Sequence, residues 1–208
     1  MKKLAIKKTL IFTIIFSLLV VFDQYTKHLA NIHLKGNKPF VIIKDIFELY
    51  YLDGGNTGAA WGIMSGNTLF LTIVPGIVCL LLIVLIYRIE MYIAYAKTKE
   101  WYTNKINLTF TSLQTFLVIL IAGAVGNLID RVTNHYVVDF FYFKLIDFPI
   151  FNVADCYVTV TMFLIIITFM FFITEGELSY IMTCKTDGLT REKEGKEKAE
   201  KTDSAEIK

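Results

Sequence analysis

Residues 156–173 read CYVTVTMFLIIITFMFFI, a stretch of 18 residues without a charged side chain. A helix rises about 1.5 Å per residue, so about 20 apolar residues cross the hydrocarbon core of a bilayer, which is roughly 30 Å thick. With its flanks, this stretch is therefore long enough to span a membrane. Three similar stretches precede it, so together they predict a membrane protein with four transmembrane helices.

The earlier apolar stretches are residues 10–22, 69–86 and 113–129. The first follows four lysines, as the apolar segment of a cleaved signal peptide would, but it ends in VVFDQ without the small residues of a cleavage site. We therefore predict that it is retained as a span. With flanks included, the predicted spans cover about residues 8–23, 69–87, 112–130 and 155–173.

Composition supports a membrane protein and argues against several other classes. The 208 residues are 55% hydrophobic and 19% charged, with a net charge of +2. This charge is too small for a nucleic-acid binder, and no basic stripe is present in the sequence. The three cysteines form no CxxC pair and the three histidines show no ligand spacing, so we expect no disulfide framework, metal or cofactor.

The distribution of Lys and Arg predicts the orientation in the membrane. Basic residues gather in the N-terminal segment, between the second and third spans, and in the C-terminal tail, so both termini are expected in the cytoplasm. The two outer segments contain stretches rich in β-branched and aromatic residues, at 39–53 and 136–151, which predict a small β-rich subdomain at the outer membrane surface. We expect residues 1–174 to form the membrane domain. The alternating Lys and Glu of residues 175–208 predict a disordered tail or a loose solvated helix.

Acidic residues near the span ends are the candidates for chemistry, because ionisable groups at membrane depth are costly and usually functional. With the predicted topology, the four that lie towards the outer face are Asp23, Asp130, Asp139 and Asp155. Two carboxylates that share a proton can hydrolyse a peptide bond without a metal or a nucleophilic side chain.

Simpler explanations exist for each residue taken alone. Asn152 followed by Asp155 is a typical helix N-cap pattern, and Asp23 with Lys27 is an ordinary i, i+4 ion pair. A transporter or proton-conducting protein, or a non-enzymatic membrane partner, would also contain four spans. A transporter predicts charges near mid-membrane, whereas these acids lie at span ends. A non-enzymatic partner leaves the polar blocks on one face unexplained.

Five short blocks occur in a characteristic order: DQYTK at 23–27, NTGAAW at 56–61, GNLIDR at 126–131, VDF at 138–140 and FNVAD at 151–155. Together they resemble the sequence blocks of the lipoprotein signal peptidase (signal peptidase II) family, over roughly residues 5–174. The resemblance implies an aspartyl endopeptidase of the bacterial inner membrane, with its site near the outer face. Such an enzyme removes signal peptides from prolipoproteins on the N-terminal side of the cysteine that carries diacylglycerol.

The resemblance also implies roles for individual residues. It makes Asp130 and Asp155 the catalytic pair and leaves Asp139 structural. Site support or substrate binding falls to Asp23, Lys27, Asn56, Gly58, Asn127, Arg131 and Asn152. The implied partners are diacylglyceryl-modified prolipoproteins and membrane lipid, and the implied state is a monomer.

The helix dipole predicts which acid of the pair acts as the base and which as the proton donor. It favours a carboxylate at the start of the fourth span and a protonated acid at the end of the third. We therefore expect Asp155 to act as the base and Asp130 as the proton donor.

Overall fold

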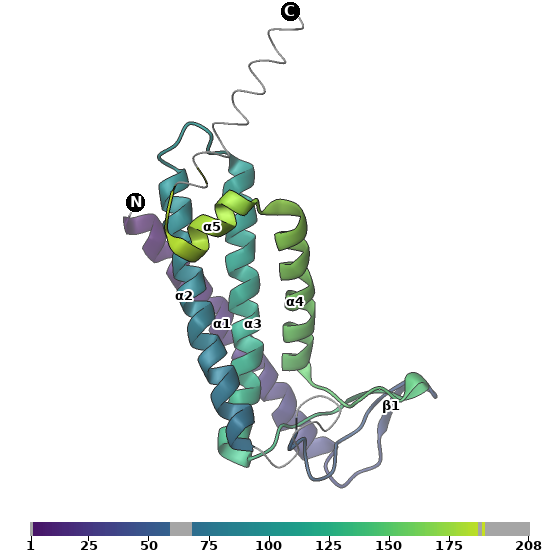
Figure 1. Ribbon diagram of the computed structural model, residues 1–208. Coiled ribbons are helices and arrows are strands. Elements are labelled where there is room, and N and C mark those ends of the chain that lie inside the picture. Colours follow the sequence, from purple (N-terminus) through teal and green to yellow (C-terminus); the bar gives the residue numbers. More distant parts are fainter. Residues whose placement is uncertain (1, 59–67, 187–188, 190–208) are drawn as a thin grey trace, which may run out of the picture. The chain divides into compact units, whose positions relative to one another are not determined.

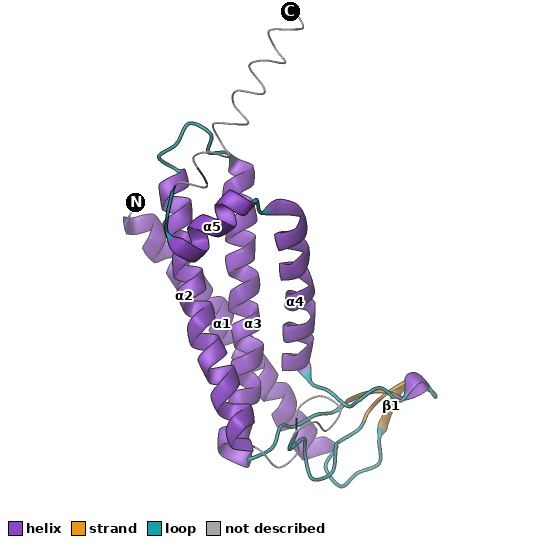
Figure 2. Ribbon diagram, viewed as in Figure 1, coloured by secondary structure: helices purple, strands orange, loops and turns teal. Residues whose placement is uncertain are grey.

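The computed structural model describes residues 2–58, 68–186 and 189, so Ala59, Ala60 and Trp61 of the second block lie outside the described residues. Figures 1 and 2 show long helices together with a small sheet. The helices are α1 (Lys2–His33), α2 (Thr68–Ala96), α3 (Asn104–Asn134), α4 (Val153–Phe172) and α5 (Glu175–Thr183). The chain forms two compact units, one of Met1–Leu81 with Phe116–Met162 and the other of Leu82–Thr115 with Phe163–Lys208.

The prediction of a mainly helical membrane protein is confirmed. Within the described residues, α2, α3 and α4 are long and apolar enough to cross a membrane. Helix α1 has 32 residues and carries the predicted first span. It continues well past the predicted end near residue 23, because no glycine or proline interrupts the chain before Gly36. Asp23 and Lys27 therefore lie inside a helix rather than after one.

The first unit contains a three-stranded antiparallel sheet in the order β1–β2–β3. Its strands are β1 (Phe40–Ile43), β2 (Phe47–Leu49) and β3 (Phe141–Phe143), and they fall within the two stretches predicted to be β-rich. An isolated bridge pairs Asn56 with Val137. The bridge ties the second sequence block to the chain that follows α3.

A small apolar core connects the end of α1 with this sheet region. Ala30 of α1 and Leu34, the residue after its end, belong to one buried cluster with Tyr51, Val138 and Phe140. The cluster fixes the segment between α3 and β3 against α1. As a result, Asp139 is held between two buried apolar neighbours in the sequence.

Two glycines of α3 allow close approach of the backbone in the first unit. A Cβ atom at Gly126 would lie 2.5 Å from Oδ2 of Asp23, and one at Gly123 would lie 2.6 Å from the carbonyl oxygen of Ala154. Because real Cβ atoms do not make contacts this short, α3 can reach α1 and the start of α4 only with glycine at both positions.

In the second unit, the start of the predicted tail is ordered. Residues 175–183 form α5, which begins with a capping box between Thr174 and Glu177. The Tyr92 hydroxyl donates to Oε1 of Glu177 at 2.8 Å, and the ring of Tyr180 stacks on that of Tyr95 with centroids 5.0 Å apart. Of the two expectations for the tail, disorder or a loose solvated helix, residues 175–183 form a helix, and its Tyr180 and Glu177 side chains are packed against α2. The high charge of the rest of the tail obscured a short helix with one apolar face.

Candidate active site

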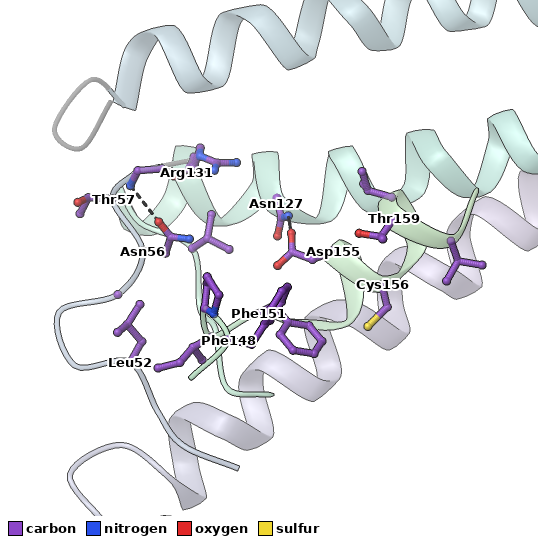
Figure 3. Close-up of a pocket in the computed structure, with 17 residues that line it drawn as sticks. Leu52, Asn56, Thr57, Asn127, Arg131, Phe148, Phe151, Asp155, Cys156 and Thr159 are labelled. Atoms are coloured by element: carbon purple, nitrogen blue, oxygen red, sulfur yellow. Dashed lines mark hydrogen bonds between the residues drawn. The ribbon is translucent and has the colours of Figure 1, made fainter. Parts of the chain in front are cut away.

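A pocket of about 820 Å³ lies in the first unit (Figure 3). Four of the predicted site residues with ionisable or amide side chains line it: Asn56, Asn127, Arg131 and Asp155. Much of the remaining wall is apolar and includes Phe148, Pro149, Ile150, Phe151 and Val158. The pocket therefore combines a carboxylate with a hydrophobic surface, as expected of a site that binds an apolar peptide.

Asp155 is fixed by the first turn of α4 and by α3. Its backbone N–H donates to Oδ1 of Asn152 at 3.0 Å, and its own Oδ2 accepts from the backbone N–H of Asn152 at 3.1 Å. Oδ1 of Asp155 accepts from Nδ2 of Asn127 at 2.8 Å. The N-cap interpretation of Asn152 is thus correct, and the same contacts hold the Asp155 carboxylate at the pocket wall.

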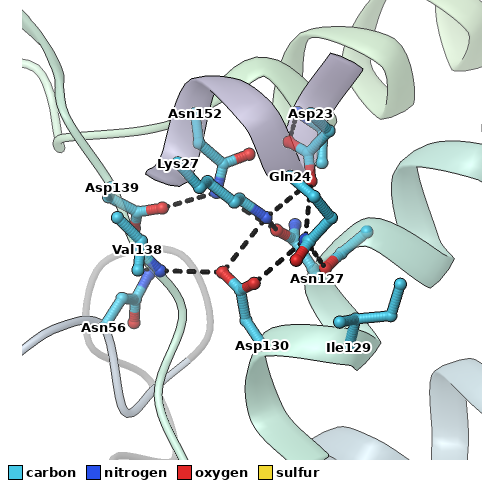
Figure 4. A network of polar contacts seen from close by, with 12 residues as sticks. Asp23, Gln24, Lys27, Asn56, Asn127, Ile129, Asp130, Val138, Asp139 and Asn152 are labelled. Carbon is cyan, nitrogen blue, oxygen red and sulfur yellow. Dashed lines mark hydrogen bonds and ion pairs between the residues drawn. The ribbon is translucent and has the colours of Figure 1, made fainter. Parts of the chain in front are cut away.

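Asp130 has different surroundings (Figure 4). It is 2% exposed and is not among the residues that line the pocket. Its Oδ2 lies 3.2 Å from Nζ of Lys27 and accepts from the backbone N–H of Val138 at 3.0 Å, while Oδ1 accepts from Nε2 of Gln24 at 3.0 Å. The carboxylate is therefore committed to an ion pair and to two further donors.

Asp139 is also buried, with 1% exposure, and like Asp130 it is not among the residues that line the pocket, but its hydrogen bonds come from two neutral amides. Nδ2 of Asn152 donates to Oδ1 at 2.6 Å, and Nδ2 of Asn56 donates to Oδ2 at 2.8 Å. Burial, together with the negative charge of Asp155, raises the pKa of Asp139 to about 7. Asp139 and Asp155 thus share Asn152 and influence each other's charge.

Lys27 extends from α1 into the same cluster. Its Nζ lies 2.9 Å from Oδ2 of Asp23 and donates to Oδ1 of Asn127 at 2.8 Å, and the residue is 2% exposed. The i, i+4 ion pair with Asp23 is therefore present, but it is buried and shared with Asp130. Removing one partner of a buried pair leaves the other charge uncompensated, which costs more stability than losing an exposed pair.

The second sequence block forms another part of the pocket. The backbone N–H of Gly58 donates to Oδ1 of Asn56 at 3.0 Å, and the carbonyl oxygen of Gly58 accepts from Nη2 of Arg131 at 3.3 Å. All three residues line the pocket. The structure therefore brings the predicted site residues together in one unit.

Sequence reasoning missed two features of the site. Nε2 of Gln24, in the first sequence block beside Asp23, lies within hydrogen-bond distance of Asp23, Asp130 and the carbonyl oxygen of Gly126. The other feature is the position of Asp139 beside Asn152, for which the spacing gave no signal. In the part of the chain that the structure describes, no three His, Cys, Asp or Glu side chains are grouped to hold a metal ion.

Comparisons with known proteins agree on one family. The family model described as "Signal peptidase (SPase) II" matches residues 15–171. The lipoprotein signal peptidase of Clostridium tetani is 37% identical over 157 residues, covering 74% of this chain and 88% of the relative. That of Staphylococcus aureus (strain MRSA252) is 35% identical over 153 residues, covering 73% and 82%.

Two solved structures of bacterial membrane enzymes, determined by the in meso method, are also similar. The first, at 2.3 Å resolution, has a TM-score of 0.60 and 34% identity, covering 76% of this chain and 87% of that one. The second, at 1.9 Å resolution, has a TM-score of 0.58 and 34% identity, covering 78% and 94%. The sequence blocks, the helical fold and the pocket that holds the Asp155 carboxylate thus lead to the same conclusion. The chain belongs to the signal peptidase II family, the aspartic peptidases that remove signal peptides from prolipoproteins.

Proposed function

We propose that this peptidase activates water with Asp139 and Asp155, and that Asp130 is not the partner of Asp155. The single observation that carries the proposal is the side chain and backbone of Asn152, which donate to Asp139 at 2.6 Å and to Asp155 at 3.1 Å. The resemblance had pointed to Asp130 instead. Its contacts favour a different role.

The ion pair of Asp130 conflicts with proton donation. A general acid must be protonated before it acts, whereas an ammonium group at 3.2 Å, that of Lys27, favours the charged form of a carboxyl group. Asp130 also accepts from a backbone N–H and an amide, so its charge is offset by three donors. These contacts suit a residue that holds the site together.

The Asp139–Asp155 pair suits the chemistry better. Asp155 lines the pocket and, as the base, takes a proton from water while the water oxygen attacks the scissile carbonyl carbon. Asp139, whose pKa of about 7 keeps a large protonated fraction at neutral pH, gives its proton to the carbonyl oxygen. The C–N bond then breaks as Asp155 returns its proton to the leaving amine, and Asp139 recovers a proton as the carbonyl reforms.

The pocket wall supports a substrate with an apolar region beside the scissile bond. We propose that the substrate is a diacylglyceryl-modified prolipoprotein, cut on the N-terminal side of the modified cysteine. Phe148, Phe151 and Val158 offer apolar contact next to Asp155. The distribution of Lys and Arg supports a multi-pass protein of the bacterial inner membrane, with cytoplasmic termini and the site near the outer face. We further propose that it acts as a monomer in contact with membrane lipid.

Three purified variants test the assignment: Asp130→Asn, Asp139→Asn and Asp155→Asn. Turnover of a lipidated precursor is measured per amount of folded protein, with thermal stability followed in parallel. We expect the second and third variants to lose turnover at least 1,000-fold while staying folded, since an amide cannot exchange the proton. Asp130→Asn should lower stability and retain measurable turnover per folded molecule. Near-normal turnover of Asp139→Asn would return the role of partner to Asp130.

A further inference from the structure

Lys27 occupies the centre of the buried polar cluster in Figure 4. Its ammonium group contacts Oδ2 of Asp23 at 2.9 Å, Oδ2 of Asp130 at 3.2 Å and Oδ1 of Asn127 at 2.8 Å. An ammonium has three N–H donors and no acceptor, so these three contacts match its full capacity. Asp23, Asp130 and Asn127 each make further hydrogen bonds, and these connect Lys27 to the rest of the site.

The two carboxylates each bind a backbone N–H elsewhere in the chain. Oδ1 of Asp23 accepts from the N–H of Ala154 at 2.9 Å, and Oδ2 of Asp130 accepts from the N–H of Val138 at 3.0 Å. Ala154 and Val138 are the residues that directly precede the two proposed catalytic carboxylates. Each carboxylate around Lys27 therefore holds the backbone beside one member of the pair.

The third acceptor reaches the pair directly. Because Lys27 can only donate, it requires the oxygen of the Asn127 amide to face it, and Nδ2 of Asn152 also donates to that oxygen at 3.1 Å. The nitrogen of the Asn127 amide is left facing Oδ1 of Asp155, at 2.8 Å. If the Asn127 amide were rotated by 180°, its NH2 group would face the donors of Lys27 and Asn152. Its oxygen would then face the carboxylate oxygen of Asp155.

We propose that Lys27 is a positioning residue that sets the relative placement of Asp139 and Asp155 through Asp23, Asp130 and Asn127. The inference rests on the proposed assignment of the catalytic pair. Without the ammonium, two buried carboxylates face each other with their shared cation removed, and like charges at low dielectric repel. If the carboxylates of Asp23 and Asp130 moved apart, the backbone N–H groups of Ala154 and Val138 that are bonded to them would move as well.

This role differs from that of a simple structural ion pair. A structural pair affects how much protein is folded and leaves each folded molecule equally active. A positioning residue affects the chemical step in molecules that are folded and bind substrate normally. Misplacement of reacting groups by about 1 Å can lower a rate about 100-fold. The separation of kcat from KM therefore distinguishes the two roles.

The experiment uses the purified full chain with a lipidated precursor as substrate. We expect Lys27→Met to lower kcat per folded molecule at least 100-fold while KM changes less than threefold. Lys27→Arg keeps the cation and should recover at least tenfold of that loss. Lys144→Met provides the control, because Lys144 also pairs with a carboxylate, that of Glu48 at 3.4 Å, and should leave kcat within twofold.

A second variant decides the matter if Lys27→Met does not fold. Both oxygens of Asp23 accept hydrogen bonds, so Asp23→Asn must give up either the Ala154 N–H or Lys27. Its kcat per folded molecule should fall at least tenfold. A kcat within twofold of the unmodified protein in either variant, or a loss confined to KM, overturns the proposal. If Asp139→Asn retains turnover, the assignment of the pair fails instead, so the two failures are separable.

Discussion

Replacing Asp139 by Asn should flatten the pH dependence of stability. The pKa of Asp139 in the folded protein is about 7, against a reference value of 3.8, because burial and the charge of Asp155 disfavour the ionised form. A raised pKa means that the folded state binds more protons than the unfolded state between these two values. Stability from this group is therefore fully present below about pH 4 and is lost as the pH rises through 7.

The size of the effect follows from the same two values. Between pH 5 and pH 8, ionisation of Asp139 should cost the folded state about 2 to 3 kcal/mol. For a chain of this size, that corresponds to a fall in Tm of about 4–12 °C. Asn at this position has no proton to lose, so Asp139→Asn should lack this component of the fall.

The assay is thermal unfolding of purified protein in detergent, at half-unit steps from pH 5 to pH 8. Asp45→Asn serves as the control because Asp45 is exposed, and its left-handed backbone (φ 60°) suits Asn equally well. The control should follow the unmodified protein. If Asp139→Asn shows the same fall in Tm as the control, Asp139 does not hold a proton near neutral pH. The proton-donor role would then be refuted.

The remaining predictions concern packing, the tail and topology. Gly126→Ala should destabilise the protein by about 1–3 kcal/mol, since the added methyl meets a buried carboxylate, whereas Gly76→Ala has open space and should be neutral or stabilising in thermal unfolding. Truncation after residue 186 should leave precursor turnover intact, but truncation after residue 174 removes α5 and should lower Tm measurably. With native exposed cysteines replaced, a cysteine at residue 35 should react with an impermeant thiol reagent from outside. One in the α2–α3 loop should not, and the reverse pattern would contradict the proposed orientation.

The helices were predictable because hydropathy alone determines which segments enter a bilayer. The extension of α1 to His33 was not, since hydropathy drops after Phe22 while the helix continues. Its last turns are stabilised by tertiary contacts, with Lys27 and Ala30 both buried. A hydropathy pattern does not report such contacts.

The site was predictable as a set of residues, because the topology places the relevant span ends on one face. The proposed partner of Asp155 was harder to choose, since Asp130 and Asp139 both lie in sequence blocks of the family. What separates them is a lysine reaching from α1, more than 100 residues earlier in the sequence, towards Asp130. Helix spacing along α3 cannot report that contact.

Because α1 is one continuous helix, its length relates the position of its N-terminal lysines to the position of the site. Lys8 and Lys27 are 19 residues apart on one continuous helix, which corresponds to roughly 28 Å along its axis. That length nearly equals the hydrocarbon thickness of a typical bilayer, about 30 Å. In the proposed orientation, with the N-terminal lysines among headgroups on one side, the helix would place the buried ammonium of Lys27 at the opposite boundary between acyl chains and headgroups. The lipid-linked cysteine of the proposed substrate would be held at this same level by its own acyl chains, so in this topology the first helix would match the height of the cutting site to that of its substrate.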